Sequence, residues 1–144
     1  MPTFPARLVT PEQVLLEEDV AAVILRTDVG DATFLPGHTR LIGAIVPGPV
    51  RFQREDGTEE IAAVHGGFVQ VDPGHVAVLA PVAELAADID LDRARRALQA
   101  AGDDQPELDR GDHEGGAQSA TGAAAARRRA EVRIEVAEGA GRPG

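Results

Sequence analysis

Residues 50–64, VRFQREDGTEEIAAV, hold two short runs suited to β-strands on either side of an Asp-Gly pair. Val50 to Arg54 alternates apolar and polar side chains, as in a strand with one exposed face. Asp56-Gly57 favours a tight hairpin turn, because both residue types tolerate a positive φ. Glu60 to Val64 then returns as the partner strand. This stretch predicts an antiparallel hairpin and a β fold for the chain around it.

Short apolar and β-branched runs recur on both sides of this hairpin, with turn residues between them. Asp72-Pro73-Gly74 is one such turn, since proline presets φ and glycine supplies a positive φ. Roughly eight to ten short strands at this close spacing predict a β-sandwich or flattened barrel over residues 1–88, and not βαβ units. The other strands are expected at Phe4–Val9, Val20–Thr27, Leu41–Val46, Phe68–Val71, His75–Leu79 and Ala83–Ala87.

The periodicity changes after the predicted strands, and residues 89–138 are expected to form a helical region. The apolar spacing from Ile89 to Leu98 fits a short amphipathic helix with Asp90 as its N-cap and Gly102 at its end. The whole chain is therefore predicted to be β + α, a sandwich followed by a two-helix C-terminal region.

The predicted helical region contains a break in composition. Residues 102–121 are rich in acids and glycine and almost lack large apolar side chains, so a flexible linker is expected there. Gly122 to Val136 is expected to be the second helix, because it is rich in alanine, the best helix former. Residues 139–144 are expected to be a disordered tail.

Composition limits the function. Hydrophobic residues make up 43% of the 144 positions, enough for a folded domain. The N-terminus lacks the pattern of a signal peptide, and no apolar run approaches the ~18 residues of a membrane span. A net charge of −10 disfavours nucleic-acid binding, because phosphates repel an acidic chain.

Reactive side chains are scarce. The chain has no Cys, Lys or Tyr, and Ser119, its one serine, falls in the predicted linker. A P-loop nucleotide site needs a lysine and is therefore excluded. The four histidines show no metal-ligand spacing, and the Glu-Glu pairs lie beside turns. Neither a catalytic site nor a metal site is predicted, which points to binding or regulation.

Four stretches together resemble the epsilon subunit of the F-type ATP synthase. They are LVTPEQVLLEEDVAAVILRTDVGDATFLPGH (8–38), AIVPGPVRF (44–52), VHGGFVQVDPGHVAVLA (64–80) and IDLDRARRAL (89–98). The likeness implies a ten-stranded β-sandwich followed by two helices. It also implies a non-catalytic subunit of a synthase that makes ATP from ADP and phosphate, driven by proton flow.

The resemblance further implies partners and a location. The sandwich would sit on the gamma subunit and touch the ring of c subunits, and the helices, when extended, would restrain ATP hydrolysis against the beta and alpha subunits. Such a subunit is a peripheral protein on the cytoplasmic face of the bacterial cell membrane. A stand-alone ATP-sensing module is the alternative function.

The loop from Gly30 to His38 corresponds to the family segment near the c ring. The resemblance makes Asp31 and His38 the polar contacts there. The alternative is that Pro36-Gly37 forms only a tight turn and His38 is a surface residue. Thr33 stands where the family commonly has a second glycine.

A second motif resembles the pattern with which some epsilon subunits bind ATP between their folded helices. The chain is then expected to need no cofactor, with ATP as a regulatory ligand. The alternative is ordinary helix chemistry, in which Asp90 caps the helix and Asp92 pairs with Arg95 or Arg96. The short first helix and the long linker argue against a compact hairpin. The residues implied are Ile89, Asp90, Arg93 and Ala94, with Arg127 or Arg128 from the second helix.

Four arginines are expected to form a basic face on the second helix. In the family, such a helix can meet an acidic segment of the beta subunit. The alternative is a solvated helix with internal pairs to Glu131 and Glu135. The four are Arg127, Arg128, Arg129 and Arg133.

Overall fold

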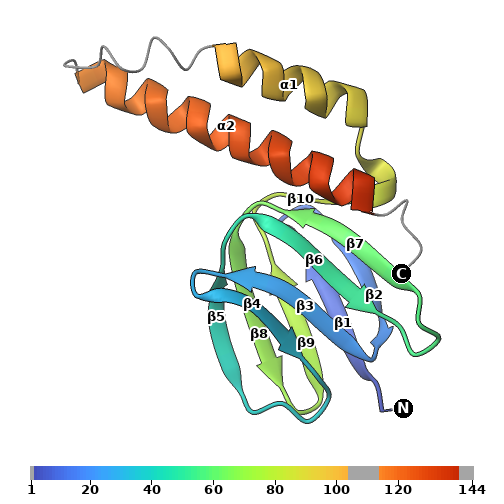
Figure 1. The fold of residues 1–144 in the computed structure, drawn as a ribbon. Helices are drawn as coiled ribbons and strands as arrows, with labels where there is room; N and C mark the ends of the chain where they lie inside the picture. The colour runs from blue at the N-terminus through green and yellow to red at the C-terminus, as the bar shows by residue number, and fades with distance from the viewer. Residues whose placement is uncertain (1, 104–113, 140–144) are drawn as a thin grey trace.

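The computed structural model describes residues 2–103 and 114–139 and contains ten strands in two sheets. One sheet, here sheet A, has the order β2 (Val14–Val20), β1 (Phe4–Val9), β9 (His75–Leu79), β8 (Gly67–Asp72), β5 (Leu41–Ile45). The other, sheet B, has the order β10 (Ala83–Leu85), β7 (Glu59–Val64), β6 (Gly48–Gln53), β3 (Ala22–Thr27), β4 (Gly30–Phe34). The predicted sandwich followed by two helices is thereby confirmed (Figure 1).

The hairpin predicted from residues 50–64 is present as β6 and β7. Its strands pair up to Gln53 and Glu59, and Asp56 Oδ1 accepts a hydrogen bond of 2.9 Å from the Thr58 backbone N–H. Gly57 adopts a φ of +89°, the positive value that the Asp-Gly pair favours.

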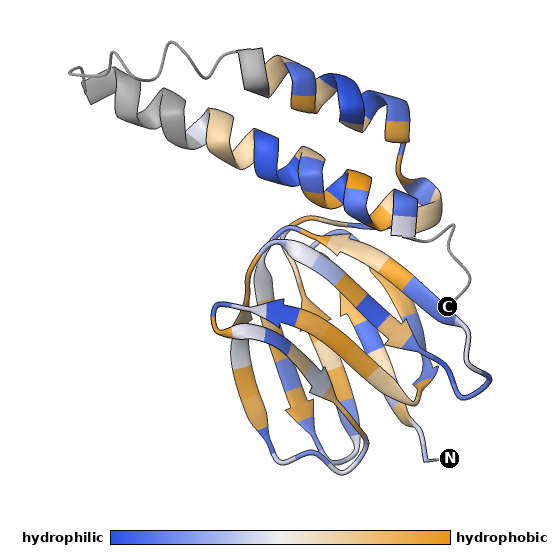
Figure 2. Cartoon of the chain, viewed as in Figure 1, coloured by the Kyte–Doolittle hydropathy of each residue, from blue (hydrophilic) through white to orange (hydrophobic). Residues whose placement is uncertain are grey.

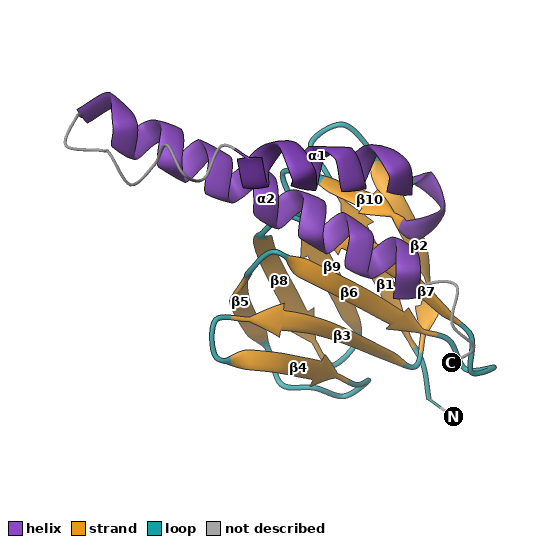
Figure 3. Ribbon diagram, turned by 45° about the horizontal axis from the view of Figure 1, so that its top comes forward, coloured by secondary structure: helices purple, strands orange, loops and turns teal. Residues whose placement is uncertain are grey.

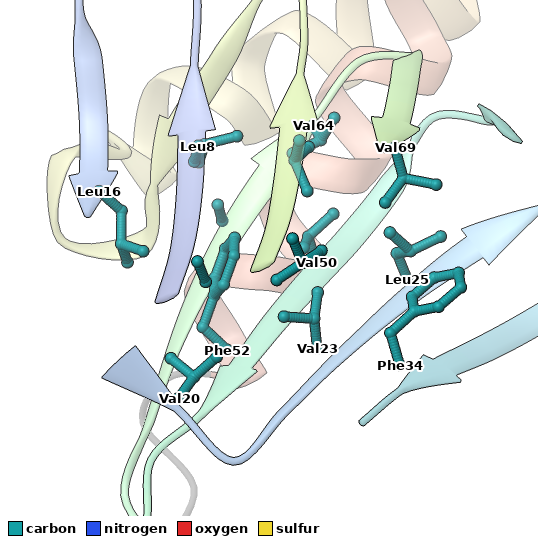
Figure 4. Packing of buried hydrophobic residues seen from close by; sticks show 14 of the residues in the cluster. Leu8, Leu16, Val20, Val23, Leu25, Phe34, Val50, Phe52, Val64 and Val69 are labelled. Atoms are coloured by element: carbon teal, nitrogen blue, oxygen red, sulfur yellow. The ribbon is translucent and has the colours of Figure 1, made fainter. Parts of the chain in front are cut away.

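The main core lies between the two sheets. Apolar and polar residues alternate along the strands, so each sheet turns one apolar face inward (Figure 2). Side chains from both sheets meet there, including Leu8 and Val69 from sheet A and Val23, Val50 and Phe52 from sheet B (Figure 4). With few aromatic residues, valine is the most frequent residue of this core.

Two strands were not expected as separate elements. β2 and β4 are edge strands of their sheets, and polar side chains interrupt their apolar runs, Glu17, Glu18 and Asp19 in β2 and Asp31 and Thr33 in β4. Polar side chains on an edge strand discourage pairing with other chains. Such strands lack a continuous apolar run, and their sequences therefore did not predict them. The last expected strand is also shorter, because Ala86–Asp88 form one turn of 3₁₀ helix.

The helices are longer than expected. α1 spans Leu91–Asp103 and α2 spans Glu114–Gly139, so both extend into the stretch 102–121 predicted as a linker. Helix extension is cooperative, and the alanine-rich segment propagates beyond Gly122. Residues 104–113 of the predicted linker and residues 140–144 of the predicted tail lie outside the described residues.

The two helices form a hairpin that rests on sheet B (Figures 1 and 3). The small side chains of Ala94 and Ala130 are buried and allow close helix packing, and Arg95 of α1 pairs with Glu138 of α2 at 3.1 Å. The expectation that a short helix and a long linker prevent a compact hairpin is therefore wrong.

A second apolar cluster joins the hairpin to the sandwich. α2 places Val132 and Val136 on Ile61 and Ala63 of β7, and Ile89 packs at the edge. The inward residues Ala62 and Val64 belong to the main core, so β7 is covered on both faces. This explains why the run IAAV lacks the alternation of a half-exposed strand.

Candidate functional site

A cavity of about 320 Å³ lies where the hairpin meets the sandwich. It contains most of the motif that resembles an ATP-binding pattern, together with acidic residues. Its lining residues are Glu84, Asp88, Asp90, Arg93, Ala94, Ala97 and Arg133.

Asp90 caps α1 in this cavity. Its Oδ1 accepts a hydrogen bond of 3.0 Å from the backbone N–H of Arg93. The Arg93 guanidinium has no ion-pair partner in the part of the chain that the structure describes, so it is available to a ligand. Capping and ligand binding are therefore compatible here. The expected pairing of Arg95 with Asp92 is wrong, because Arg95 binds Glu138.

The remaining residues of the motif have separate places. Ile89 packs in the second apolar cluster and supports the hairpin. Arg127 pairs with Glu131 at 3.0 Å, and Arg128 lines a different cavity. The structure brings Asp90, Arg93 and Ala94 together, but it does not bring Arg127 or Arg128 to them.

The four arginines of α2 have different surroundings, and their expected role as one basic face stays a prediction. Successive residues of an α-helix point about 100° apart, so Arg127, Arg128 and Arg129 must point in different directions. Arg133 forms an ion pair with Glu84 of β10. Arg128 and Arg129 line a cavity of about 530 Å³ between α2 and the sandwich.

His65 also lines this larger cavity and was not singled out from the sequence. Its side chain is 4% exposed, and Nε2 lies 3.6 Å from the Glu84 carboxylate. Burial lowers the pKa of His65 below its usual value, and the positive charge of Arg133 lowers it further. The imidazole is therefore neutral at pH 7.

Asp31 and His38 lie apart, at the two ends of β4. Asp31 is opposite Arg26 in the strand register and forms a 3.6 Å ion pair with it. His38 follows the turn that Gly37 makes with a φ of +89°, and its ring packs edge-on against Phe34. The turn expected at Pro36-Gly37 is present, and the Gly37 N–H donates to the Pro73 carbonyl at 3.0 Å.

An exposed apolar patch on the outer face of sheet A was also missed. Ala44, Phe68 and Leu79 are register partners across β5, β8 and β9, and Ile42 lies one step along the same face. Phe68 is 58% exposed. The signal was available in GFVQV, where Phe68 takes the face opposite the buried Val69 and Val71.

In the ranges 2–103 and 114–139, no group of three or more His, Asp or Glu is arranged to hold a metal ion. No helix in these ranges combines the length and the apolar character needed to cross a membrane.

Comparisons with known proteins agree with the fold and the resemblance. The family described as ATP synthase, Delta/Epsilon chain, beta-sandwich domain matches residues 3–86. An ATP synthase epsilon chain of Streptomyces griseus subsp. griseus is 37% identical over 127 residues, covering 88% of this chain and 89% of the relative. That of Bacillus subtilis is 42% identical over 101 residues, covering 70% and 76%.

Solved structures give the same result. A chain of the Euglena gracilis mitochondrial ATP synthase, determined as OSCP/F1/c-ring, has a TM-score of 0.66 at 25% identity, covering 94% of this chain and 78% of that one. A chain of the Tetrahymena thermophila mitochondrial ATP synthase central stalk and c-ring has a TM-score of 0.57 at 13% identity, which supports the fold alone. The resemblance inferred from four sequence stretches is confirmed.

Proposed function

The chain belongs to the delta/epsilon chain family of the ATP synthase, and from this premise we propose how its parts work in that complex. It is a subunit of a membrane-associated assembly that makes ATP. We place it in the central stalk on the cytoplasmic face of the bacterial membrane, with the catalytic sites on other subunits. There it couples proton-driven rotation to ATP synthesis.

The outer face of sheet A is proposed to bind the gamma subunit. The observation that carries this proposal is the exposed apolar row of Ala44, Phe68 and Leu79. Contiguous apolar surface of this kind is typical of a protein interface. α2 packs on β7 and β6 of the opposite sheet (Figure 3), whereas sheet A makes no comparable contact with a helix of the described residues.

The His38 loop and Asp31 are proposed to approach the c ring. His38 is held by Phe34, and its loop is joined to the β8–β9 turn, so this end of the sandwich is stiff. Asp31 lies toward α2, because its partner Arg26 also pairs with Glu135 at 3.5 Å. A contact between Asp31 and the c ring would therefore depend on whether Glu135 of the hairpin is paired with Arg26.

The hairpin is proposed to switch between this docked form and an extended form that restrains ATP hydrolysis. The docked form is held by a small apolar cluster and by ion pairs such as Arg133–Glu84. In the extended form, contacts with other subunits would replace them. In the extended form, Arg128 and Arg129 would be offered to acidic segments of the beta and alpha subunits.

Phe68→Ser is expected to weaken gamma binding by about tenfold to about a hundredfold, because burying one large apolar side chain contributes about 1.5–3 kcal/mol. The measurement is the affinity of the purified chain for purified gamma. Val29→Ser is the matched control, since Val29 is exposed on the turn between β3 and β4. Equal affinity of wild type and Phe68→Ser would assign gamma to another face.

ATP is proposed as a regulatory ligand of the smaller cavity, because among the described residues Arg93 has no ion-pair partner beside the Asp90 cap. Calorimetry with ATP is expected to give binding to the wild type and binding at least about tenfold weaker for Arg93→Ala, which lacks the charge-assisted bonds. Arg96→Gln, which removes one positive charge of α1 from a residue that does not line this cavity, should bind as the wild type does. No heat with the wild type would end this proposal and the alternative of a stand-alone ATP sensor, but would leave gamma binding standing.

A further inference from the structure

His65 lies where the docked hairpin meets the sandwich. It follows β7 directly, and its backbone N–H donates to the Val82 carbonyl at 3.1 Å, which fixes it beside the start of β10. α2 faces it across the cavity of about 530 Å³, which Arg128 and Arg129 line from the helix. The surroundings of this imidazole therefore depend on whether α2 is docked.

The docked form leaves this imidazole without a partner. Its side chain is 4% exposed, and among the described residues neither Nδ1 nor Nε2 has a hydrogen-bond partner. A buried polar group without a partner destabilises the state that buries it. A proton taken up here would bury a charge as well, which is more unfavourable still unless an anion is free to neutralise it.

The carboxylate nearest to His65 already has a partner. Glu84 of β10 lies 3.6 Å from His65 Nε2, but it accepts a hydrogen bond from the Arg133 guanidinium of α2. The other connections beside His65, residues 46–47 and 80–82, carry no titratable side chain. The charged groups of the described residues that face the imidazole are therefore one acid of β10 and three bases of α2, namely Glu84, Arg128, Arg129 and Arg133.

We propose that protonation of His65 releases the hairpin from the sandwich, with Glu84 exchanging Arg133 for the imidazolium as its partner. This inference rests on the proposed switch between a docked and an extended hairpin. When α2 leaves, its positive charges leave with it and water reaches the ring. Glu84 stays on β10 beside His65, so the released sandwich gains an ion pair in place of the one that it loses.

The direction of the pH dependence follows from the two forms. In the docked form, burial and then the charge of Arg133 hold the pKa of His65 below its usual value of 6.5. In the released form, hydration and the freed Glu84 carboxylate remove both causes. The released form therefore binds the proton more strongly, so docking is unaffected well above pH 6.5 and weakens as the pH falls through that value. Acidification favours the extended hairpin, which is the form proposed to restrain ATP hydrolysis.

The test measures release of the hairpin in the full chain through a single thiol. The chain has no cysteine, and Val132 is 5% exposed where α2 packs on β7, so Val132→Cys gives one thiol that docking shields. Its rate of modification by dithiodipyridine, a reagent that also reacts in acid, is followed from about pH 8 to about pH 5.5. The same measurement on His65→Gln, which cannot take up the proton, gives a rate ratio from which the pH dependence of the thiol itself cancels.

This ratio, with His65 over His65→Gln, is expected to be constant above about pH 7.5 and to rise in acid by up to about tenfold per pH unit. His75→Gln is the matched control, since His75 is exposed and pairs with Asp72, and it should keep the rise. Far-UV circular dichroism checks the fold of each variant, and His65→Phe, which also cannot be protonated, serves if His65→Gln loses it.

A second measurement follows the imidazole NMR signal of His65 directly. Arg133→Gln should raise the pKa of His65 above that of the wild type, because it removes a positive charge and frees the Glu84 carboxylate. A purely structural role of His65 would leave this pKa unchanged.

A protected thiol whose rate ratio does not change with pH would overturn this inference and leave the proposed switch standing. An unchanged pKa of His65 in Arg133→Gln would overturn it as well. The exposed thiol of Gln99→Cys on α1 gives the rate of an unshielded reference. If Val132→Cys reacts as fast as this reference, or does not react at any pH, the hairpin does not switch between two forms, and the proposed switch fails together with the inference.

Discussion

Gly67→Ala is expected to destabilise the sandwich by about 3–5 kcal/mol, a loss reserved for severe steric or strain effects. Gly67 has a φ of +127°, and a Cβ atom built there would lie 2.2 Å from the Leu79 carbonyl oxygen. The clash is with backbone of the adjacent strand β9, so a side-chain movement cannot relieve it. Urea unfolding monitored by circular dichroism measures the loss.

Gly57→Ala separates strain from contact. Gly57 also has a positive φ, +89°, but a Cβ atom there would meet nothing within 4 Å. Its cost should be about 1 kcal/mol, the penalty for placing alanine in the left-handed region. Equal losses for the two variants would show that close approach to β9 does not constrain Gly67.

Phe52→Ala is expected to cost about 3–5 kcal/mol, the usual loss for removing a buried aromatic ring. Phe52 is 0% exposed and lies between the sheets among Val20, Val23 and Val50 (Figure 4). These short side chains cannot extend into the space left by the ring, so a cavity remains. A domain of this size has a free energy of unfolding of about 5–15 kcal/mol, so the substitution would remove a large part of its stability.

Phe68→Ala makes the same chemical change on the surface of the same sandwich. Phe68 is 58% exposed, so its stability should stay within about 1 kcal/mol of the wild type. Thermal unfolding of both variants gives the comparison. A large loss of stability for Phe68→Ala would mean that this ring supports the fold, and its effect on gamma binding would then have to be reinterpreted.

The two sheets of the sandwich differ in what lies on their outer faces. α2 covers sheet B through Val132 and Val136, while sheet A keeps Phe68 and Leu79 exposed. One sheet therefore packs against the helical hairpin, and the outer face of the other keeps apolar side chains exposed. The cavities with Arg93 and with Arg128 lie on the hairpin side of the sandwich.

The sequence by itself determined the strands that have a buried face and the turns between them. Asp56-Gly57 has turn chemistry that depends on local φ preferences, and Gly57 takes the predicted positive φ. The turn at Asp72-Pro73-Gly74 is present, but the positive φ expected at Gly74 is wrong. Asp72 Oδ1 instead accepts hydrogen bonds from the Gly74 and His75 backbone N–H groups at 2.7 and 2.9 Å, which is equally local chemistry. The Asp90 cap was predictable for the same reason, since a cap bonds a backbone group three residues away. The edge strands β2 and β4 were missed, because polar edges resemble loops.

Only the tertiary structure decided which charges remain unpaired and which cavities they line. Arg95 pairs with Glu138 and Arg133 with Glu84, across separations that local spacing does not encode. The burial of His65 likewise depends on loops distant in sequence and on the docked α2. Local chemistry sets strands, turns and caps, whereas contacts between distant segments set the environment of each ionisable group, and that environment defines the sites.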